Sequence, residues 1–355
     1  MSKLKFALVG CGRIAKKHTE ALNNIHDAEL VTVCDIKEGR AREYGDKYDI
    51  PYYTNYDKML QNENIDVVNI LTPSGFHAEH TIDIVKKYKK HIVCEKPMAL
   101  KLKDADNVIR VCDENGVRLF VVKQNRYNLP VQKLREALEK GRFGKLVMGT
   151  VRVRWARHQH YYDMDEWRGT WAMDGGVLTN QASHHIDLLE WMMGQPIEVS
   201  AQTATRLVDI EVEDTGVVII KFENGALGVI EATTATRPKD LEGSLSILGE
   251  RGAVEIGGFA VNEMKVWQFE DGEEDDKKVL EQFKENPPNV YGFGHIRYLE
   301  HVIDCIKNNK KALVDGIEGR KSLELINAIY EAAETGKNVK LRFEPNRCKL
   351  GISYD

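Results

Sequence analysis

The sequence predicts two domains, an α/β domain with a parallel sheet followed by an α+β domain with a mostly antiparallel sheet. First, 355 residues are too many for one ordinary hydrophobic core. Second, short apolar runs alternate with longer amphipathic runs from residue 4 to about residue 122, the pattern of strands joined by crossover helices. Third, after residue 145 the apolar runs follow one another through short turns. We therefore place the domains at residues 1–123 and 124–355.

The first domain is expected to hold a doubly wound parallel sheet. Its strands are predicted at the short apolar runs Lys5–Val9, Ala28–Cys34, Val67–Leu71, His91–Cys94 and Arg118–Val122. Its helices are predicted between the strands, at Arg13–Asn23, Lys37–Tyr48, Tyr56–Gln61, Ala78–Lys87 and Lys103–Asn115.

The second domain is expected to be an antiparallel meander with one polar face. Its strands are predicted at Val147–Trp155, Glu198–Thr205, Asp214–Phe222, Leu227–Thr234, Leu241–Leu248 and Ala253–Ile256. Two late helices, near Gly294–Lys307 and Gly319–Thr335, are expected to pack against this sheet, and Gly336 stands where a helix C-terminal glycine belongs. The polar stretch Glu270–Glu285 is expected to be a solvated loop or a strand edge.

Composition favours a soluble globular protein. Apolar residues make up 42% and charged residues 30% of the chain, and the formal net charge of −5 gives no general attraction to nucleic acid or to an anionic membrane. No apolar run approaches the ~20 residues that cross a bilayer, and the first residues show no signal-peptide pattern. The six cysteines form no Cys-x-x-Cys pair. A cytoplasmic location with reduced thiols is therefore expected.

A nucleotide-binding turn is predicted at residues 10–15, which read Gly-Cys-Gly-Arg-Ile-Ala. The turn follows an apolar strand and opens a helix, and an acid, Asp35, stands at the end of the next strand. Gly10 permits the tight turn, and Gly12 lets the backbone approach a pyrophosphate at the helix N-terminus. Asp35 would accept hydrogen bonds from the adenosine ribose, and Ile36 brings no cation for a 2′-phosphate. The expected cofactor is therefore NAD, bound by a Rossmann domain.

Two further segments follow strands of the first domain, at residues 71–77 and 94–97, where ligands bind in open α/β sheets. The second segment contains Glu95-Lys96-Pro97. An ammonium held near a nicotinamide can hydrogen-bond a reacting hydroxyl and stabilise negative charge on its oxygen, which makes Lys96 a catalytic candidate. A structural ion pair of Lys96 with Glu95 is the alternative.

In the second domain, the segment 175–187 carries Asn180, His184 and Asp187 at spacings that a helix would place on one face. An imidazole suits the removal of a hydroxyl proton near neutral pH, so His184 is the candidate base, with a buried core histidine as the alternative. His185 points elsewhere on such a helix and is expected to be structural. The segment has no His-Glu-x-x-His pattern, and no metal is expected.

The glycine turn, the Glu-Lys-Pro triplet and the Gly-Gly…His-x-x-Asp segment, in that order, resemble the Gfo/Idh/MocA oxidoreductase family over nearly the whole chain. The resemblance implies a Rossmann domain joined to an open-faced antiparallel sheet, which binds substrate and forms dimers or tetramers. It also implies catalysis by the triplet lysine with an aspartate and a histidine four residues later. Lys96 and His184 match, but Asn180 stands at the aspartate position, which leaves the proton work to Lys96 and His184.

Four segments resemble one subgroup of the family, the UDP-N-acetylglucosaminuronate 3-dehydrogenases, in which asparagine also replaces the aspartate. These segments are residues 123–126, 167–171, 180–184 and 290–295. The resemblance implies NAD-dependent oxidation of the C3 hydroxyl of UDP-N-acetyl-2-amino-2-deoxy-D-glucuronate, on the route to the diacetamido uronic acids of bacterial surface polysaccharide (O-antigen). It leaves open whether NAD leaves after each turnover or is reoxidised in place by a 2-oxo acid.

The motifs and the resemblance together give two expected sets of contacts. The cofactor contacts are Gly10, Gly12, Arg13, Ile14, Asp35, Thr72, Pro73, Ser74, His77, Glu95, Lys96, Gln124, Trp167 and Arg168. The substrate contacts are Lys96, Asn125, Arg126, Arg157, Tyr161, Arg168, Asn180, Gln181, His184 and Tyr291.

A UDP-sugar acid carries two phosphates and a carboxylate, and basic side chains that suit such anions gather near the start of the second domain. They are Arg126, Arg152, Arg154, Arg157, His158, His160 and Arg168. Arg152 and Arg154 face one side of their predicted strand, which could instead be a solvated sheet face or a subunit interface. Tyr161, Tyr162, Trp167 and Trp171 could stack on uracil or sugar.

Three other functions remain open at this stage. Two are reactions of the same family, oxidation of a simple sugar or polyol and NAD-dependent glycoside cleavage through transient C3 oxidation. The third is an NAD-binding sensor without turnover, which would need neither Lys96 nor His184.

Overall fold

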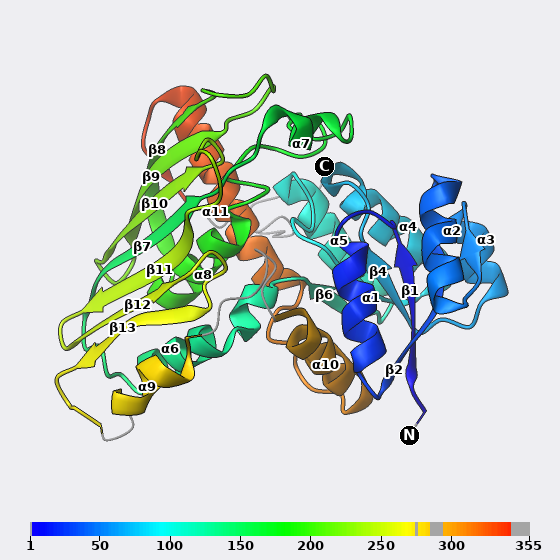
Figure 1. The fold of residues 1–355 in the computed structure, drawn as a ribbon, viewed down its shortest axis with the longest axis horizontal. Coiled ribbons are helices and arrows are strands. Elements are labelled where there is room, and N and C mark those ends of the chain that lie inside the picture. Colours follow the sequence, from blue (N-terminus) through cyan, green and yellow to red (C-terminus); the bar gives the residue numbers. More distant parts are fainter. Residues whose placement is uncertain (1, 274–275, 285–293, 342–355) are drawn as a thin grey trace, which may run out of the picture.

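A computed structural model describes residues 2–273, 276–284 and 294–341. The described chain forms two sheets, a smaller parallel one and a larger, mostly antiparallel one (Figure 1). Helix α11 runs between them and contacts β6 of the first sheet and β8 of the second. The fold class predicted from the sequence is therefore confirmed. No helix in these residues is both long and apolar enough to cross a membrane.

The first sheet has six parallel strands in the order β3-β2-β1-β4-β5-β6. Its strands are β1 (Leu4–Val9), β2 (Ala28–Cys34), β3 (Tyr52–Tyr53), β4 (Val67–Ile70), β5 (His91–Cys94) and β6 (Leu119–Val121). The helices along this part of the chain are α1 (Ala15–Asn24), α2 (Glu38–Tyr48), α3 (Tyr56–Asn62), η1 (Ser74–Phe76), α4 (His77–Tyr88), α5 (Leu102–Glu114) and η2 (Gln124–Tyr127). The order reverses at β1 and β4, which is where an open α/β sheet binds its ligand. All five strands predicted for this domain are present, and the short edge strand β3 is an addition.

The second sheet has eight strands in the order β13-β12-β11-β7-β10-β9-β8-β14. Its strands are β7 (Leu146–Arg154), β8 (Pro196–Ala204), β9 (Thr215–Phe222), β10 (Leu227–Thr233), β11 (Glu242–Gly249), β12 (Gly252–Gly257), β13 (Glu263–Phe269) and β14 (Val339–Lys340). One central pair, β7 with β10, is parallel, so the sheet is not a simple meander. The sequence analysis did not predict β13 and β14.

The remaining helices are α6 (Leu129–Glu139), α7 (Gln159–Asp163), α8 (Ser183–Met193), α9 (Asp276–Gln282), α10 (Gly294–Lys307) and α11 (Gly316–Thr335). Helices α6, α8 and α11 contribute buried apolar residues to one core with the second sheet. The expectation that α10 packs on this sheet is wrong. Its residues Tyr298, Leu299 and Val302 share a core with Phe6 and Leu8 of β1, because its apolar face covers the first domain.

The expectation of a solvated loop or strand edge at Glu270–Glu285 is also wrong, because α9 lies within it. The helix is fixed by buried contacts that its polar composition does not reveal. Val279 enters the core of the second domain. The nearly buried Arg142 pairs with both Asp271 and Asp276 at 2.6 Å.

Candidate active site

The glycine turn has the geometry that a pyrophosphate site requires. Gly10 has a φ of +106°, and a Cβ there would lie 2.6 Å from the backbone of Leu71, so only glycine fits. A Cβ at Gly12 would meet nothing within 4 Å, which leaves this stretch of backbone open to a ligand. Arg13 and Ile14 complete the turn, and α1 then begins with no side chain capping its N-terminus. Its free N–H groups suit an anion.

Asp35 lies directly beside this turn. Its carboxylate accepts hydrogen bonds from the backbone N–H groups of Cys11 and Lys37, both at 2.8 Å, and retains lone pairs for ribose hydroxyls. Ile36 is 88% exposed and brings no charge. Lys37 and Arg40 are close, but both pair with Asp165 of the second domain. The residues present therefore fit NAD and not a 2′-phosphate.

The two strand-end segments of the first domain are held together by His77. This buried ring lies 2.7 Å from the carbonyl oxygens of both Thr72 and Pro97. Pro73 and Ser74 form the start of η1 between β4 and α4. The backbone N–H of Gly75 donates to Met173 of the second domain at 3.0 Å. The structure thus places the segment 72–77 against both the Glu-Lys-Pro triplet and the second domain.

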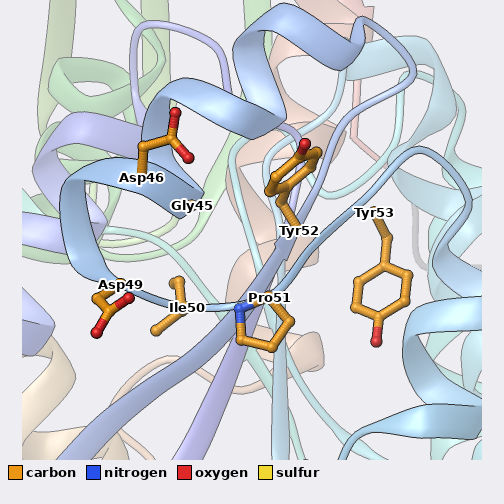
Figure 2. Close-up of a pocket in the computed structure, with 7 residues that line it drawn as sticks. All are labelled: Gly45, Asp46, Asp49, Ile50, Pro51, Tyr52 and Tyr53. Atoms are coloured by element: carbon orange, nitrogen blue, oxygen red, sulfur yellow. The ribbon is translucent and has the colours of Figure 1, made fainter.

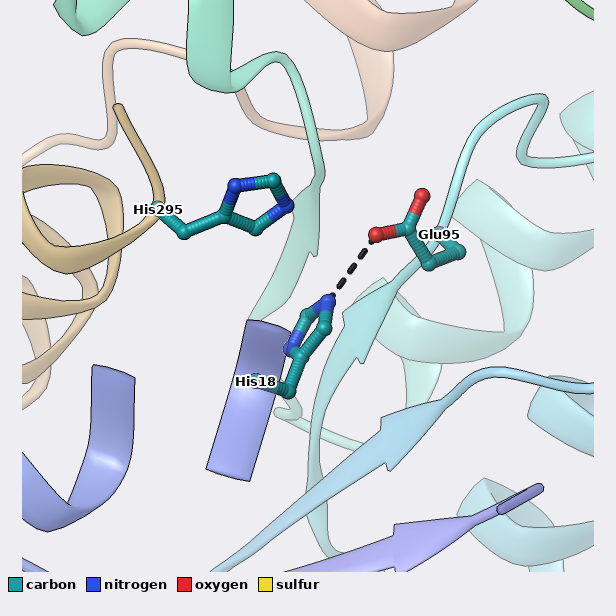
Figure 3. A group of neighbouring side chains, drawn as sticks. All are labelled: His18, Glu95 and His295. Atoms are coloured by element: carbon teal, nitrogen blue, oxygen red, sulfur yellow. Dashed lines mark hydrogen bonds and ion pairs between the residues drawn. The ribbon is translucent and has the colours of Figure 1, made fainter. Parts of the chain in front are cut away.

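Glu95 lies in a buried cluster with His18 of α1 and His295 of α10 (Figure 3). Its carboxylate accepts from His18 at 2.9 Å and from the backbone N–H of Lys96 at 3.1 Å. Burial alone raises the pKa of Glu95, but the hydrogen bond and charge of His18 outweigh it and lower this pKa to about 2. The alternative ion pair with the Lys96 amine is therefore not what holds Glu95.

The same three side chains each offer a possible metal-ligand atom within 4.8 Å of the others. Both ring nitrogens of His18 already make hydrogen bonds, to Glu95 and to Asn69, each at 2.9 Å. We therefore interpret the cluster as a hydrogen-bonded support beneath Lys96. The expectation that the protein needs no metal stays a prediction.

Lys96 and His184 come together across the domain boundary. The Lys96 Nζ donates a hydrogen bond to the backbone carbonyl of Asn180, in the turn that leads into α8. His184 lies in the first turn of α8, and its Nε2 is 3.1 Å from the Gln124 amide nitrogen. Burial, followed by the charges of Lys96 and Lys123, holds the pKa of His184 well below its usual value. Its imidazole is thus neutral at pH 7, the form that accepts a proton.

Several polar atoms in this region are buried without a protein hydrogen-bond partner. They are Gln124 Oε1, Asn125 Oδ1, Gln181 Oε1 and His184 Nδ1. Buried polar atoms nearly always have partners in folded proteins, so among the described residues these atoms are available to a polar ligand or to water. All four residues were predicted to contact cofactor or substrate.

Three guanidinium groups surround the ring of Tyr161. Arg13 of the glycine turn, Arg157 and Arg168 lie 5.4, 5.5 and 4.7 Å from the ring centroid. Arg168 also donates to the Tyr161 hydroxyl at 2.8 Å and stacks on Trp167. This cation cluster joins the expected cofactor turn to the second domain and suits a phosphate or carboxylate.

Arg126, predicted to bind substrate, is directed elsewhere. Its guanidinium is 2% exposed, makes a bidentate ion pair with Asp187 at 2.8 and 2.9 Å, and lies 3.3 Å from Glu318. It also lies over the ring of Trp191. Within segment 123–126, which resembles the subgroup, Arg126 therefore packs in the protein interior and does not face a ligand. Arg126 is held in the interior because the buried carboxylate of Asp187 in α8 needs a cation as its partner.

Other basic residues are also engaged in ion pairs. Arg152 and Arg154 lie on the outer face of the second sheet and pair with glutamates of neighbouring strands. Both arginines thus lie on an outer sheet face, in keeping with the alternative of a solvated sheet face or a subunit interface. Asn180 does not share a helix face with His184, because α8 begins only at Ser183. Tyr291 lies outside the described residues.

The structure adds one residue that the sequence analysis missed. Asp174 is buried next to the active site and accepts hydrogen bonds from the Asn180 amide and the Gly169 backbone. Its position immediately before Gly175 and Gly176 is the only signal in the sequence.

A surface hollow of about 460 Å³ lies elsewhere, at the edge of the first sheet (Figure 2). It is lined by the end of α2 and by residues 49–53, and Tyr52 and Tyr53 point in opposite directions there. None of the expected site residues lines it. We therefore locate the site from the convergence of Lys96 and His184.

Comparison with known proteins agrees with this geometry. Residues 4–123 match the model "Oxidoreductase family, NAD-binding Rossmann fold", and residues 135–341 match "Oxidoreductase family, C-terminal alpha/beta domain". The chain thus belongs to the Gfo/Idh/MocA oxidoreductase family. It is an NAD-dependent dehydrogenase.

Two solved structures are similar over nearly the whole chain. The WlbA dehydrogenase from Bordetella pertussis, in complex with NADH and UDP-GlcNAcA, is 42% identical with a TM-score of 0.90, covering 97% of this chain and 99% of its own. The WlbA dehydrogenase from Chromobacterium violaceum, with the same ligands, is 42% identical with a TM-score of 0.91, covering 97% and 98%. Myo-inositol 2-dehydrogenase from Thermotoga maritima is 29% identical over 95% of this chain and 98% of its own.

Proposed function

We propose that this dehydrogenase oxidises the C3 hydroxyl of UDP-N-acetyl-2-amino-2-deoxy-D-glucuronate to a ketone, as a step toward diacetamido uronic acids of bacterial surface polysaccharide. The observation that carries the proposal is that Lys96 of the first domain reaches the Asn180 carbonyl, four residues before His184, and that its charge acts on the His184 imidazole. The cation cluster around Tyr161 supports an anionic nucleotide sugar. The two similar WlbA dehydrogenase structures are complexes with UDP-GlcNAcA, the abbreviated name of this nucleotide sugar. This similarity supports the particular substrate.

In the proposed mechanism, NAD supplies the hydride acceptor for the hydrogen on the sugar C3. The neutral imidazole of His184 takes the proton of the C3 hydroxyl. The Lys96 ammonium donates a hydrogen bond to the same oxygen and stabilises its developing negative charge. Gln124 holds the His184 ring, and the pair of Glu95 and His18 fixes the backbone at Lys96.

The guanidinium groups of Arg13, Arg157 and Arg168 are proposed to bind the phosphates and the carboxylate. The buried side-chain oxygens of Gln181 and Asn125 would then accept hydrogen bonds from hydroxyl or amide groups of the ligand. This division of contacts would give partners to the unpartnered oxygens of Gln181 and Asn125.

The outer face of the second sheet is proposed to join subunits. Val217 and Ile219 of β9 are about half exposed, as is Leu227 of β10, which lies opposite Lys221 in the register. The ion-paired Arg152 and Arg154 lie on strand β7 beside them. Because an exposed apolar face of this kind marks an interaction surface, we propose a homodimer or homotetramer. Sedimentation analysis tests it, and a monomer at all concentrations contradicts it.

The substrate is tested by following NADH absorbance with UDP-GlcNAcA, with free sugars and with myo-inositol. We expect NADH only with the nucleotide sugar, and oxidation of myo-inositol alone would instead favour a polyol dehydrogenase. Release of a sugar without net NADH would favour glycoside cleavage, and no turnover with any compound would favour a sensor.

The cation cluster provides a matched pair of variants. Arg157→Met is expected to raise the KM for UDP-GlcNAcA by about 10- to 100-fold, since a hydrogen bond to a charged group contributes about 1.5–3 kcal/mol. Arg110→Met, on the surface of α5 with Glu114 as its partner, is the control and leaves the KM unchanged. Equal KM values for the two variants would contradict the assigned phosphate and carboxylate contacts.

A further inference from the structure

We propose that Asp174 is a positioning residue for Lys96: its buried carboxylate holds the Asn180 turn that receives the Lys96 amine, and it places a negative charge beside that turn. The inference builds on the proposed function, in which Lys96 acts as an ammonium. It gives a physical account of why an amide is tolerated at position 180, where the family usually has an aspartate.

Asp174 is almost completely buried, with 1% of its surface exposed, and both of its carboxylate oxygens accept hydrogen bonds. Oδ1 accepts from the side-chain amide of Asn180, and Oδ2 accepts from the backbone N–H of Gly169 at 3.0 Å. Hydrogen bonds from two N–H donors favour the ionised form of a carboxylate. A negative charge is therefore held at a fixed place behind the active-site turn.

Asn180 connects this charge to Lys96. Its side-chain amide donates to Asp174, while its backbone carbonyl accepts from the Lys96 Nζ. The turn itself is closed by the backbone N–H of Asn180, which donates to Gly176 at 2.9 Å. Asn180 thus connects the Asp174 carboxylate to the Lys96 amine. The carboxylate fixes the side chain of Asn180, and the amine contacts the backbone carbonyl of Asn180.

The surrounding charges show why Lys96 needs this partner. The pKa of Lys96 is lowered, with burial as the largest cause; Glu95 and then Asp174 raise it in opposition, and Lys123 and Arg168 lower it further. The ionisable groups that act on Lys96 are Glu95, Asp174, Lys123 and Arg168, with His184 close by. Glu95 already makes hydrogen bonds to His18 and to the Lys96 backbone. Asp174 is the second carboxylate that raises the pKa of Lys96, and it belongs to the second domain.

Asp174 is itself surrounded by charges of both signs. Burial raises the pKa of Asp174 above its usual value, and the hydrogen bonds from Gly169 and Asn180, followed by the charges of Arg168 and Lys96, reduce this rise without cancelling it. Glu213 and Tyr162 also interact with it. The two groups of opposite charge, Asp174 and Lys96, therefore stabilise each other in a buried site.

A purely structural role for Asp174 is the competing explanation, because the bond to Gly169 fixes the loop that carries Trp167 and Arg168. Two variants separate the explanations. Asp174→Asn removes the charge, but its amide can still accept from Gly169 and bond Asn180. The double variant Asp174→Asn with Asn180→Asp exchanges the two side chains, so the hydrogen bonds remain and the charge moves closer to Lys96.

The first measurement needs no substrate. The rate at which a small acylating reagent modifies the Lys96 amine is followed against pH by peptide mass spectrometry, in the NAD-loaded enzyme. We expect the apparent pKa of Lys96 to fall by about one pH unit in Asp174→Asn and to return in the exchanged double variant. Glu211→Gln is the control, because this exposed carboxylate also accepts a backbone N–H, from Trp171, but does not face Lys96.

The second measurement is the pH profile of kcat with UDP-GlcNAcA. Asp174→Asn is expected to lower kcat about tenfold with a smaller change in KM, and the exchange is expected to restore it. An unchanged Lys96 pKa in Asp174→Asn overturns the proposal, as does a fall that the exchange does not reverse. If Asp174→Asn does not fold, Asn180→Asp alone must raise the Lys96 pKa, and no rise overturns the proposal. Inactivity of the wild-type enzyme toward UDP-GlcNAcA rejects only the proposed substrate, because the labelling result stands independently.

Discussion

The buried ion pair of Arg126 and Asp187 allows a sharp test of the structure. Asp187→Leu removes the carboxylate but leaves the guanidinium of Arg126 in the protein interior. The pair is bidentate at 2.8 and 2.9 Å, and its side chains are 2% and 1% exposed. Glu318, at 3.3 Å from Arg126, is the remaining partner and is itself partly exposed.

The expected loss follows from this burial. Removal of one partner of a buried ion pair costs about 3–5 kcal/mol, because the other charge stays buried without compensation. Replacement of both partners by apolar residues of similar volume costs far less. Lys123, which lies 3.6 Å from Asp187 and donates to Ser322, loses this carboxylate in both variants alike. The double variant Arg126→Met with Asp187→Leu should therefore lose less than about half as much stability as the single variant.

Urea unfolding followed by tryptophan fluorescence provides the measurement for the wild type, Asp187→Leu and the double variant. The predicted order of stability places the double variant between the other two. A loss below about 1 kcal/mol in Asp187→Leu, or a double variant as unstable as the single one, would refute the assignment of Arg126 to a buried ion pair.

Three further predictions concern other buried or charged groups. Burial and the charge of Asp187 raise the pKa of Glu190 to about 8, so the unfolding free energy falls as the pH rises from about 4.5 to about 8 and Glu190 ionises. Glu190→Gln should flatten this pH dependence in urea titrations. An unchanged slope in the variant would contradict the raised pKa of Glu190. Asp35→Ser should lower kcat/KM with NAD and raise it with NADP, whereas equal loss with both cofactors would contradict the ribose contact. His18→Ala should reduce the unfolding free energy by about 1–3 kcal/mol, because Glu95 loses its hydrogen bond; His18→Gln should retain more stability, and equal losses would mean that the bond contributes little.

The sequence alone predicted the layers of the fold and the two halves of the site. The strands of the parallel sheet were predictable because fully buried strands are short apolar runs, and Gly10 because its conformation permits only glycine. Lys96 and His184 were predictable as candidates because of their residue types, and because Lys96 follows a strand and His184 lies in a segment with helical spacing. The contact of Lys96 with the Asn180 carbonyl, near His184, required the structure, since Lys96 and Asn180 are 84 positions apart in the chain.

Other features depend on tertiary contacts that leave no local signal. Arg126 resembles a ligand-binding arginine in sequence, and only its pairing with Asp187 shows its place in the interior. The polar helix α9 is held by Arg142, which lies more than a hundred residues earlier. Asp174 has no periodic pattern around it, and its importance follows from two hydrogen bonds that converge from different loops.

The central claim is that Lys96 and His184 act on the same hydroxyl oxygen in one step. The most direct test is single-turnover NADH formation from UDP-GlcNAcA in Lys96→Met, His184→Ala and the double variant, each confirmed to be folded and to bind NAD. Each single variant is predicted to lose about 10²–10⁴-fold in rate, and the double variant to lose much less than the product of the two losses, as residues acting together do. Near-normal turnover in either single variant, or fully multiplicative losses in the double variant, would contradict the claim.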